Sequence, residues 1–117
     1  QVRNAVVVLV ATDLVFVSPV YWFSVPSPLK LCLDQWSAWL RVPGLDFKAR
    51  MAGKRLWVVA TSGDRAKAQP MLDSCRLCAE FMGMEWKGAL WGKGGAPDTV
   101  LTDQAALAAA EAYFAPI

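Results

Sequence analysis

The chain has 117 residues, of which 56% are hydrophobic and 19% charged, and 12 basic against 10 acidic side chains give a formal net charge of +2. This length and apolar content predict a single folded domain, residues 1–117, and exclude a disordered tail. The charge is too small for a nucleic-acid-binding surface. Because the sequence has no histidine, a Ser-His-Asp triad and a His-ligated metal are also excluded within it.

Residues 2–12 form the first apolar segment, and they fit two structures. Val6–Val10 has the β-branched content of a strand, whereas its place just before Asp13 also suits the end of a helix. The run from Ala5 to Val20 is broken by Thr12-Asp13 and is too short to cross a membrane, so no membrane partner is predicted. The chain begins with Gln rather than Met, and we expect native sequence upstream of it.

Three short apolar runs predict strands. Leu14–Val17 is compact, rich in valine and ended by Ser18-Pro19, which is typical of a strand buried on both faces. Residues 54–61 form the second run, which lies between Gly53 and Gly63. Residues 86–91 form a third, weaker one.

Helical patterns lie between and after these strands. Ser27-Pro28 predicts a helix start, with the Ser side chain as N-cap and Pro at the first helical position, and Pro70 predicts a second start in the same way. Gly83 suits the end of that second helix, and an Ala-rich helix fits residues 103–114 with Thr102 as its cap. Residues 41–53 are predicted to be a long connection. The apolar stripes of the first two helices are Leu29, Cys32, Leu33 and Trp36, and Met71, Cys75, Cys78 and Met82.

The alternation of strands and helices predicts an α/β fold with a parallel sheet and right-handed crossovers. Ligands bind such sheets beyond the carboxyl ends of the strands, where residues 18–28 and 61–65 would lie. The first segment is rich in proline, serine and aromatic residues, a composition that can hold a planar ring. An ordinary strand–helix connection covered by surface aromatics would show the same composition.

The three cysteines are Cys32, Cys75 and Cys78. An odd count without a signal peptide predicts free thiols in a reducing, cytoplasmic compartment. The Cys75-x-x-Cys78 spacing falls on the apolar stripe of a predicted helix, so we expect both thiols in the core rather than in a redox or metal site.

The stretch Ser18-Pro19-Val20-Tyr21-Trp22-Phe23-Ser24-Val25-Pro26-Ser27-Pro28-Leu29-Lys30, followed by Leu33-Asp34, resembles the flavin loop of flavodoxin-like NAD(P)H-dependent FMN reductases. The sequence also resembles this family at Gly53-Lys54, Thr61-Ser62-Gly63 and residues 78–84. The resemblance therefore runs from about Asp13 to the C-terminus. It implies a flavodoxin-like fold that binds FMN non-covalently and takes hydride from NAD(P)H.

The resemblance also implies a set of cofactor-binding residues. The isoalloxazine ring and ribityl chain would be bordered by Pro19, Val20, Tyr21, Trp22, Phe23 and Ser24, and the polar edge of the ring would face Thr61, Ser62 and Gly63. Phe23 stands where the family often has a small residue. Lys30 and Asp34 match the family's Lys and Asp, and we expect them to form an exposed structural ion pair one helical turn apart. No catalytic residue and no metal site is predicted.

Members of this family begin with a strand and a Ser/Thr-rich loop that cradles the FMN phosphate at a helix N-terminus, and nothing before Asp13 matches that loop. We therefore expect a partial flavodoxin-like domain that lacks the first two strands. The predicted function is an FMN-dependent oxidoreductase that passes hydride from NAD(P)H to flavin or a small acceptor. The alternative is a non-catalytic remnant, or an oligomeric interaction module, without bound flavin. Such reductases commonly work as dimers or tetramers, and the unpaired edge of strand 14–17 also favours a homodimer or homotetramer.

Overall fold

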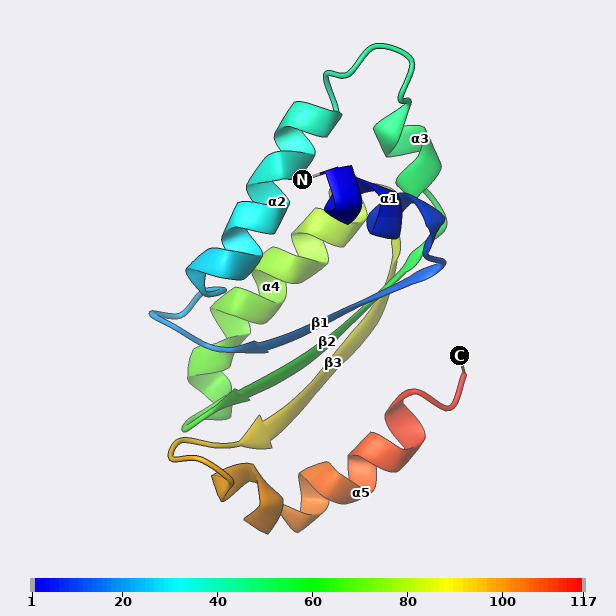
Figure 1. Cartoon of the computed structure of the whole chain (residues 1–117). Coiled ribbons are helices and arrows are strands. Elements are labelled where there is room, and N and C mark those ends of the chain that lie inside the picture. The colour runs from blue at the N-terminus through cyan, green and yellow to red at the C-terminus, as the bar shows by residue number, and fades with distance from the viewer. Residues whose placement is uncertain (1, 117) are drawn as a thin grey trace.

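The computed structural model describes residues 2–116, and Figure 1 shows its elements in chain order. Helices and strands alternate, with three strands in one sheet. The elements are α1 (Val2–Val10), β1 (Asp13–Pro19), α2 (Ser27–Trp39), α3 (Phe47–Met51), β2 (Arg55–Ser62), α4 (Arg65–Phe81), β3 (Glu85–Lys93), the 3-10 helix η1 (Thr99–Thr102) and α5 (Gln104–Tyr113).

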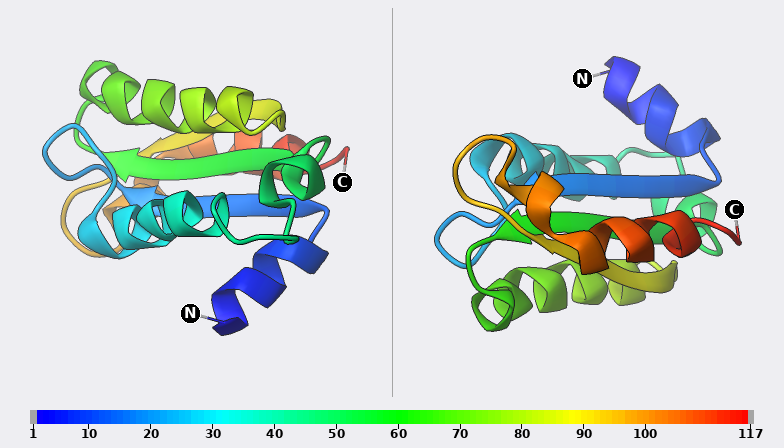
Figure 2. Two further views of the ribbon diagram at one scale, coloured as in Figure 1. Left: turned by 90° about the horizontal axis from the view of Figure 1, so that it is seen from above. Right: turned by 90° about the horizontal axis from the view of Figure 1, so that it is seen from below.

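The sheet has the order β1-β2-β3, and both pairs of strands are parallel. The register of β1 against β2 runs without interruption from Asp13 opposite Arg55 to Pro19 opposite Thr61. Helices α2 and α4 cover one face, and α5 covers the other (Figure 2). The predicted α/β architecture and its three strands are therefore confirmed, with the strand ends moved by one or two residues.

The main core lies between the sheet and the layer of α2 and α4. It is built from alternate residues of the strands and from the inner stripes of the helices, as parallel sheets covered by helices require. Burial of each large apolar side chain contributes about 1.5–3 kcal/mol. The principal members are Leu14, Phe16, Trp36, Trp39, Phe47, Met51, Leu56, Val58, Met71, Leu72 and Cys75.

Strand β1 is buried on one face rather than on both, so that expectation was wrong. Leu14 and Phe16 point into the core and are each 8% exposed, whereas Val15 and Val17 are 42% and 74% exposed. The reason is that α5 lies over β3 and β2 and does not reach β1 (Figure 2). A valine-rich run identifies a strand, but it does not show which face of the strand is covered by other elements of the chain.

Two expected helix starts differ from the structure. Pro26 rather than Ser27 is the N-cap of α2, and Pro28 lies inside the first turn, where its missing N–H costs no intrahelical hydrogen bond. Helix α4 begins at Arg65, so Pro70 lies within it instead of at its start. The side chain of Asp64 caps α4 by accepting a hydrogen bond from the Ala66 N–H at 2.9 Å, which fixes the start one turn before the proline.

Two other local expectations were also wrong. Asp103 caps α5 by accepting from the Ala106 N–H, whereas the hydroxyl of Thr102 donates to the Thr99 carbonyl within η1. The segment 41–53 is not a plain connection, because α3 lies inside it and buries Phe47. Helix α4 does end as expected, with Gly83 just beyond it at a φ of +69°.

The ambiguous first segment forms helix α1 and not a strand. Its last turn is held by Lys54, whose ammonium donates to the carbonyls of Leu9, at 3.0 Å, and Ala11. A lysine at a helix C-terminus satisfies carbonyls that lack intrahelical partners and complements the helix dipole. In residues 2–116, no helix combines the length and the apolar character needed to cross a membrane.

The cysteines are free, and they differ in burial. Cys75 lies in the core as expected, and burial raises the pKa of its thiol to about 11. Cys78 is only half-buried, so the prediction that it lies in the core was too strong, although burial still raises its pKa. A raised pKa keeps each thiol protonated and unreactive near neutral pH.

Helix α5 is anchored to the sheet through Tyr113. A register shift between Leu56 and Val58 interrupts the β2–β3 ladder opposite Gly88, which has a φ of +81°. The Tyr113 hydroxyl lies at this shift, accepting from the Val58 N–H at 3.0 Å and lying 2.8 Å from the Gly88 carbonyl oxygen. It therefore replaces hydrogen bonds that the irregular ladder leaves out.

A charged cluster joins the amino ends of β1 and β2. The Asp13 carboxylate accepts from Arg55 Nε at 2.5 Å and Nη2 at 2.6 Å, and from Trp57 Nε1 at 2.8 Å. The Asp13 side chain is only 13% exposed. Hydrogen bonds from Arg55 first and Trp57 second hold the pKa of Asp13 well below its usual range.

We expect Asp13→Asn to lower stability in a pH-dependent way. Because the folded state depresses the pKa, the carboxylate stabilises the fold above the ordinary Asp pKa of about 4, and that contribution falls progressively as the pH drops from there through the lowered pKa of the folded state. Urea midpoints of the natural chain and the variant should differ most near neutral pH and approach each other progressively as the pH falls below about 4. A difference that stays constant with pH would contradict this assignment.

Candidate functional site

The parallel sheet brings the two predicted ligand segments side by side at its carboxyl edge. Beyond the last paired residues of β1 and β2, the Val20 N–H donates to the Thr61 carbonyl at 3.2 Å, which extends the ladder by one bond. The loop after β1 and the turn after β2 therefore leave the sheet next to each other. Figure 1 shows both at the same end of the strands.

The loop after β1 contains a tight turn from Tyr21 to Ser24. These two residues exchange both backbone hydrogen bonds at 3.0 Å, and the central residues, Trp22 and Phe23, have φ values of +52° and +65°. Left-handed backbone costs about 1–2 kcal/mol for each residue with a Cβ, and glycine or asparagine is the usual occupant. The turn holds Trp22 in solvent at 92% exposure and Phe23 at 53%.

The turn after β2 is held by contacts from β3 and the loop beyond it. The Ser62 hydroxyl accepts from Trp91 Nε1 at 2.8 Å and donates to the Asp64 carbonyl at 3.2 Å, while the Gly94 N–H donates to the Ser62 carbonyl at 2.9 Å. With its single proton committed to Asp64 and one lone pair to Trp91, the hydroxyl keeps one further acceptor position. Trp91 and Gly94 therefore position Ser62 without belonging to either predicted segment.

A cavity of about 480 Å³ opens between these two turns. Its walls combine apolar and aromatic side chains of one turn with small and charged residues of the other, the mixture that small-molecule sites use. The lining residues are Val20, Trp22, Phe23, Ser62, Gly63, Asp64 and Lys67.

Five of the nine predicted cofactor-binding residues line this cavity: Val20, Trp22, Phe23, Ser62 and Gly63. The other four lie beside it. Pro19 ends β1, and Tyr21 and Ser24 close the turn through their backbones. Thr61 offers its carbonyl to Val20, and its side chain lies against Gly94, where an added Cβ would come within 3.2 Å of the Thr61 Cβ.

Asp64 lies within the predicted ligand segment 61–65 but was not among the predicted cofactor-binding residues, and Lys67 was missed altogether. Both belong to the start of α4, which Pro70 predicts further along the chain. The signal that was available is the Asp64 N-cap, since Asp is a preferred cap and helix formers follow it directly. The contact from Trp91 to Ser62 has no local sequence signal, because it joins residues 29 positions apart.

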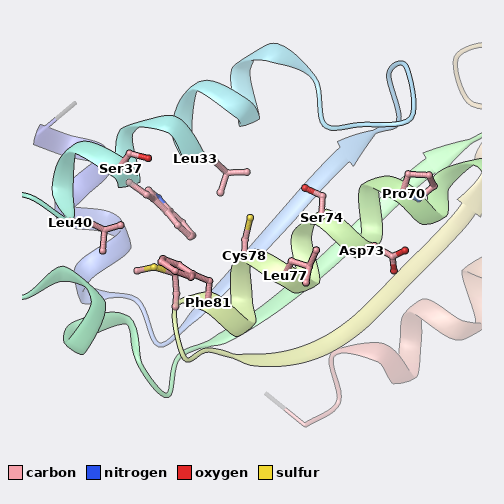
Figure 3. A pocket seen from close by; sticks show the side chains of 11 residues that line it. Leu33, Ser37, Leu40, Pro70, Asp73, Ser74, Leu77, Cys78 and Phe81 are labelled. Carbon is pink, nitrogen blue, oxygen red and sulfur yellow. The ribbon is translucent and has the colours of Figure 1, made fainter.

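A second cavity, of about 490 Å³, lies between α2 and α4, away from the carboxyl edge. Leu33 projects into it from α2, and Cys78 and Leu77 from α4, with Phe81 nearby (Figure 3). Its lining is mostly apolar. It holds none of the predicted cofactor-binding residues, so we take the cavity at the carboxyl edge as the candidate site.

Comparison with known proteins agrees with this fold. The family model described as "Flavodoxin-like fold" matches residues 7–115, and the chain therefore belongs to that family. Over 100 residues it is 41% identical to the "Putative NAD(P)H-dependent FMN-containing oxidoreductase YwqN" of Bacillus subtilis (strain 168), a match that covers 83% of this chain and 55% of that protein. The chain thus spans about half the length of this relative.

Solved structures are similar over nearly the whole chain. The Trp repressor binding protein from Bacillus subtilis superposes with a TM-score of 0.87 at 36% identity, covering 96% of this chain and 76% of that one. An NADPH-quinone reductase from P. pentosaceus gives a TM-score of 0.72 at 20% identity, with coverages of 98% and 74%. At that identity, the second likeness concerns the fold alone.

The strained turn allows a test of whether the aromatic side chains of Trp22 and Phe23 stabilise the fold. Replacing Trp22-Phe23 by Asn-Gly supplies the residues that a turn with two positive φ values prefers. We expect the free energy of unfolding to rise by about 1 kcal/mol, because the left-handed strain is relieved and the exposed Trp22 contributes little packing. Urea denaturation measures the change, and a loss of stability would show that these aromatics support the fold.

Proposed function

We propose that this chain supplies the ring-binding site of an FMN-dependent oxidoreductase that takes hydride from NAD(P)H. The observation that carries the proposal is the cavity at the carboxyl edge, where a strained turn holds Trp22 and Phe23 opposite Ser62 and Gly63. Backbone strain maintained by surrounding structure is typical of ligand sites, where a fixed geometry is needed. A stable fold alone gives no reason to keep two aromatic residues in left-handed conformations.

The residues around the cavity suit an isoalloxazine ring. Aromatic side chains on one wall can stack on a flat ring, and the small residues at Ser62 and Gly63 let backbone groups approach its polar edge. When bound, FMN would accept hydride from the nicotinamide and deliver the electrons to an acceptor. The protein's part is to orient the ring and to set the charge around it.

The similarity to YwqN supports the same activity, because that protein's name contains both NAD(P)H and FMN and the identity is 41%. We propose a small molecule as the electron acceptor, a cytoplasmic location, and neither nucleic acid nor membrane as a partner. The small net charge of +2 agrees with the absence of a nucleic-acid partner.

Titration with FMN tests the proposal. We expect saturable quenching of flavin fluorescence in the micromolar range, and roughly two- to tenfold weaker binding in Trp22→Ala, because one aromatic contact with the ring is lost. Phe81→Ala is the matched control. It removes a 61% exposed aromatic side chain that lines the cavity between α2 and α4 instead.

Two results would contradict the proposal. Folded protein that leaves flavin fluorescence unchanged at high micromolar FMN would favour the non-catalytic alternative. Equal weakening by Trp22→Ala and Phe81→Ala would mean that the ring does not lie against the turn.

We also propose that the protein is a homodimer or homotetramer. Within residues 2–116, β1 is an edge strand of the sheet, and its outward valines, Val15 and Val17, are exposed on the α5 side of the sheet, in the part that α5 does not reach. An apolar edge of this kind readily pairs with another chain. Light scattering over a range of concentrations should give a mass of two or four chains, whereas a soluble monomer at every concentration would contradict this assembly.

A further inference from the structure

The candidate cavity has two charged lining residues, and they differ in how their charges are compensated. The Asp64 carboxylate caps α4, accepting from the Ala66 N–H at 2.9 Å, so it faces the positive end of a 17-residue helix. Lys67 lies in the first turn of the same helix. Among the residues that the structure describes, none forms an ion pair with Lys67.

The neighbouring cation on α4, Arg65, lies outside the cavity. Arg65 directs its guanidinium to the Gln69 side chain at 2.9 Å, and it does not line the cavity. Lys67 is therefore the one cation, within residues 2–116, whose side chain lines the candidate site. The helix N-terminus offsets part of the charge of Asp64, so Lys67 carries the less compensated charge of the two.

This charge matters for the proposed reaction because hydride carries two electrons and one proton. A neutral oxidised ring that accepts hydride gains one negative charge until another proton arrives. A cation beside the ring stabilises the charged, reduced form relative to the neutral, oxidised form.

We propose that Lys67 makes the cavity bind reduced, anionic flavin more tightly than oxidised flavin, and so favours acceptance of hydride by the bound ring. This inference rests on the proposed FMN site and adds a role for one side chain within it. The ligand chemistry that Lys67 recognises is the negative charge that develops on the planar ring.

The experiment measures the two-electron midpoint potential of FMN bound to the full chain. We expect Lys67→Gln to reduce the preference for reduced over oxidised FMN roughly three- to tenfold, which lowers the potential by about 15–30 mV. Because Lys67 is exposed, added salt should shrink the difference between the natural chain and the variant.

Two further variants make the test specific. Asp64→Asn keeps a good N-cap and removes a negative charge from the cavity wall, so its potential should move upward by a similar amount. Arg65→Gln removes a cation from the same helical turn but outside the cavity, and its potential should stay close to that of the natural chain. A merely structural role of Lys67 would not produce opposite shifts in the Lys67 and Asp64 variants.

Dissociation constants for oxidised and reduced FMN are measured separately, so their ratio remains defined in a variant that binds more weakly overall. Bound FMN with an unchanged ratio in Lys67→Gln would overturn the inference and leave the flavin site standing. Equal shifts in Lys67→Gln and Arg65→Gln would also overturn it, because the effect would then be a general field of the helix. Failure of the natural chain to bind FMN would overturn both this inference and the proposed function.

Discussion

The parallel, uninterrupted pairing of β1 with β2 is the constraint on which the rest of this molecule depends. It matches Asp13 with Arg55 at one end and Pro19 with Thr61 at the other. Because parallel strands point the same way, the segments that follow them leave the sheet at a common edge. A shift of one residue would turn Leu14 and Phe16 out of the core, so the burial that stabilises the sheet also aligns the two halves of the candidate site.

The two faces of the sheet contribute to this arrangement in different ways. The face under α2 and α4 holds most of the core and is packed by ordinary apolar burial. The face under α5 combines packing of Trp57 against Tyr113 and Phe114 with polar anchors, namely the Tyr113 hydroxyl at the irregular β2–β3 pairing and Asp13 between Arg55 and Trp57. These anchors hold the amino half of the sheet, including its irregular β2–β3 pairing, while the carboxyl edge has a strained turn and exposed aromatics. The polar anchors and the candidate cavity therefore lie at opposite ends of the strands.

Much of the architecture follows from local sequence. Short apolar runs placed all three strands, and Gly83 placed the end of α4, because hydrophobic pattern and positive φ are properties of a few neighbouring residues. Prolines were less informative. Pro28 does lie in the first turn of α2, as predicted, whereas Pro70 lies inside α4 and the side chain of Asp64 decided where that helix starts.

By itself, the sequence determined the order of strands and helices, the resemblance to flavodoxin-like reductases, and five of the residues that line the candidate cavity. Only the tertiary structure decided that Val15 and Val17 face outward, that Trp91 holds Ser62, and that Lys67 joins Trp22 and Phe23 at one cavity. The physical reason is distance along the chain. A helix cap or a strand is determined by residues that are adjacent in the sequence, whereas a cavity wall forms only when strand pairing and packing bring distant turns together.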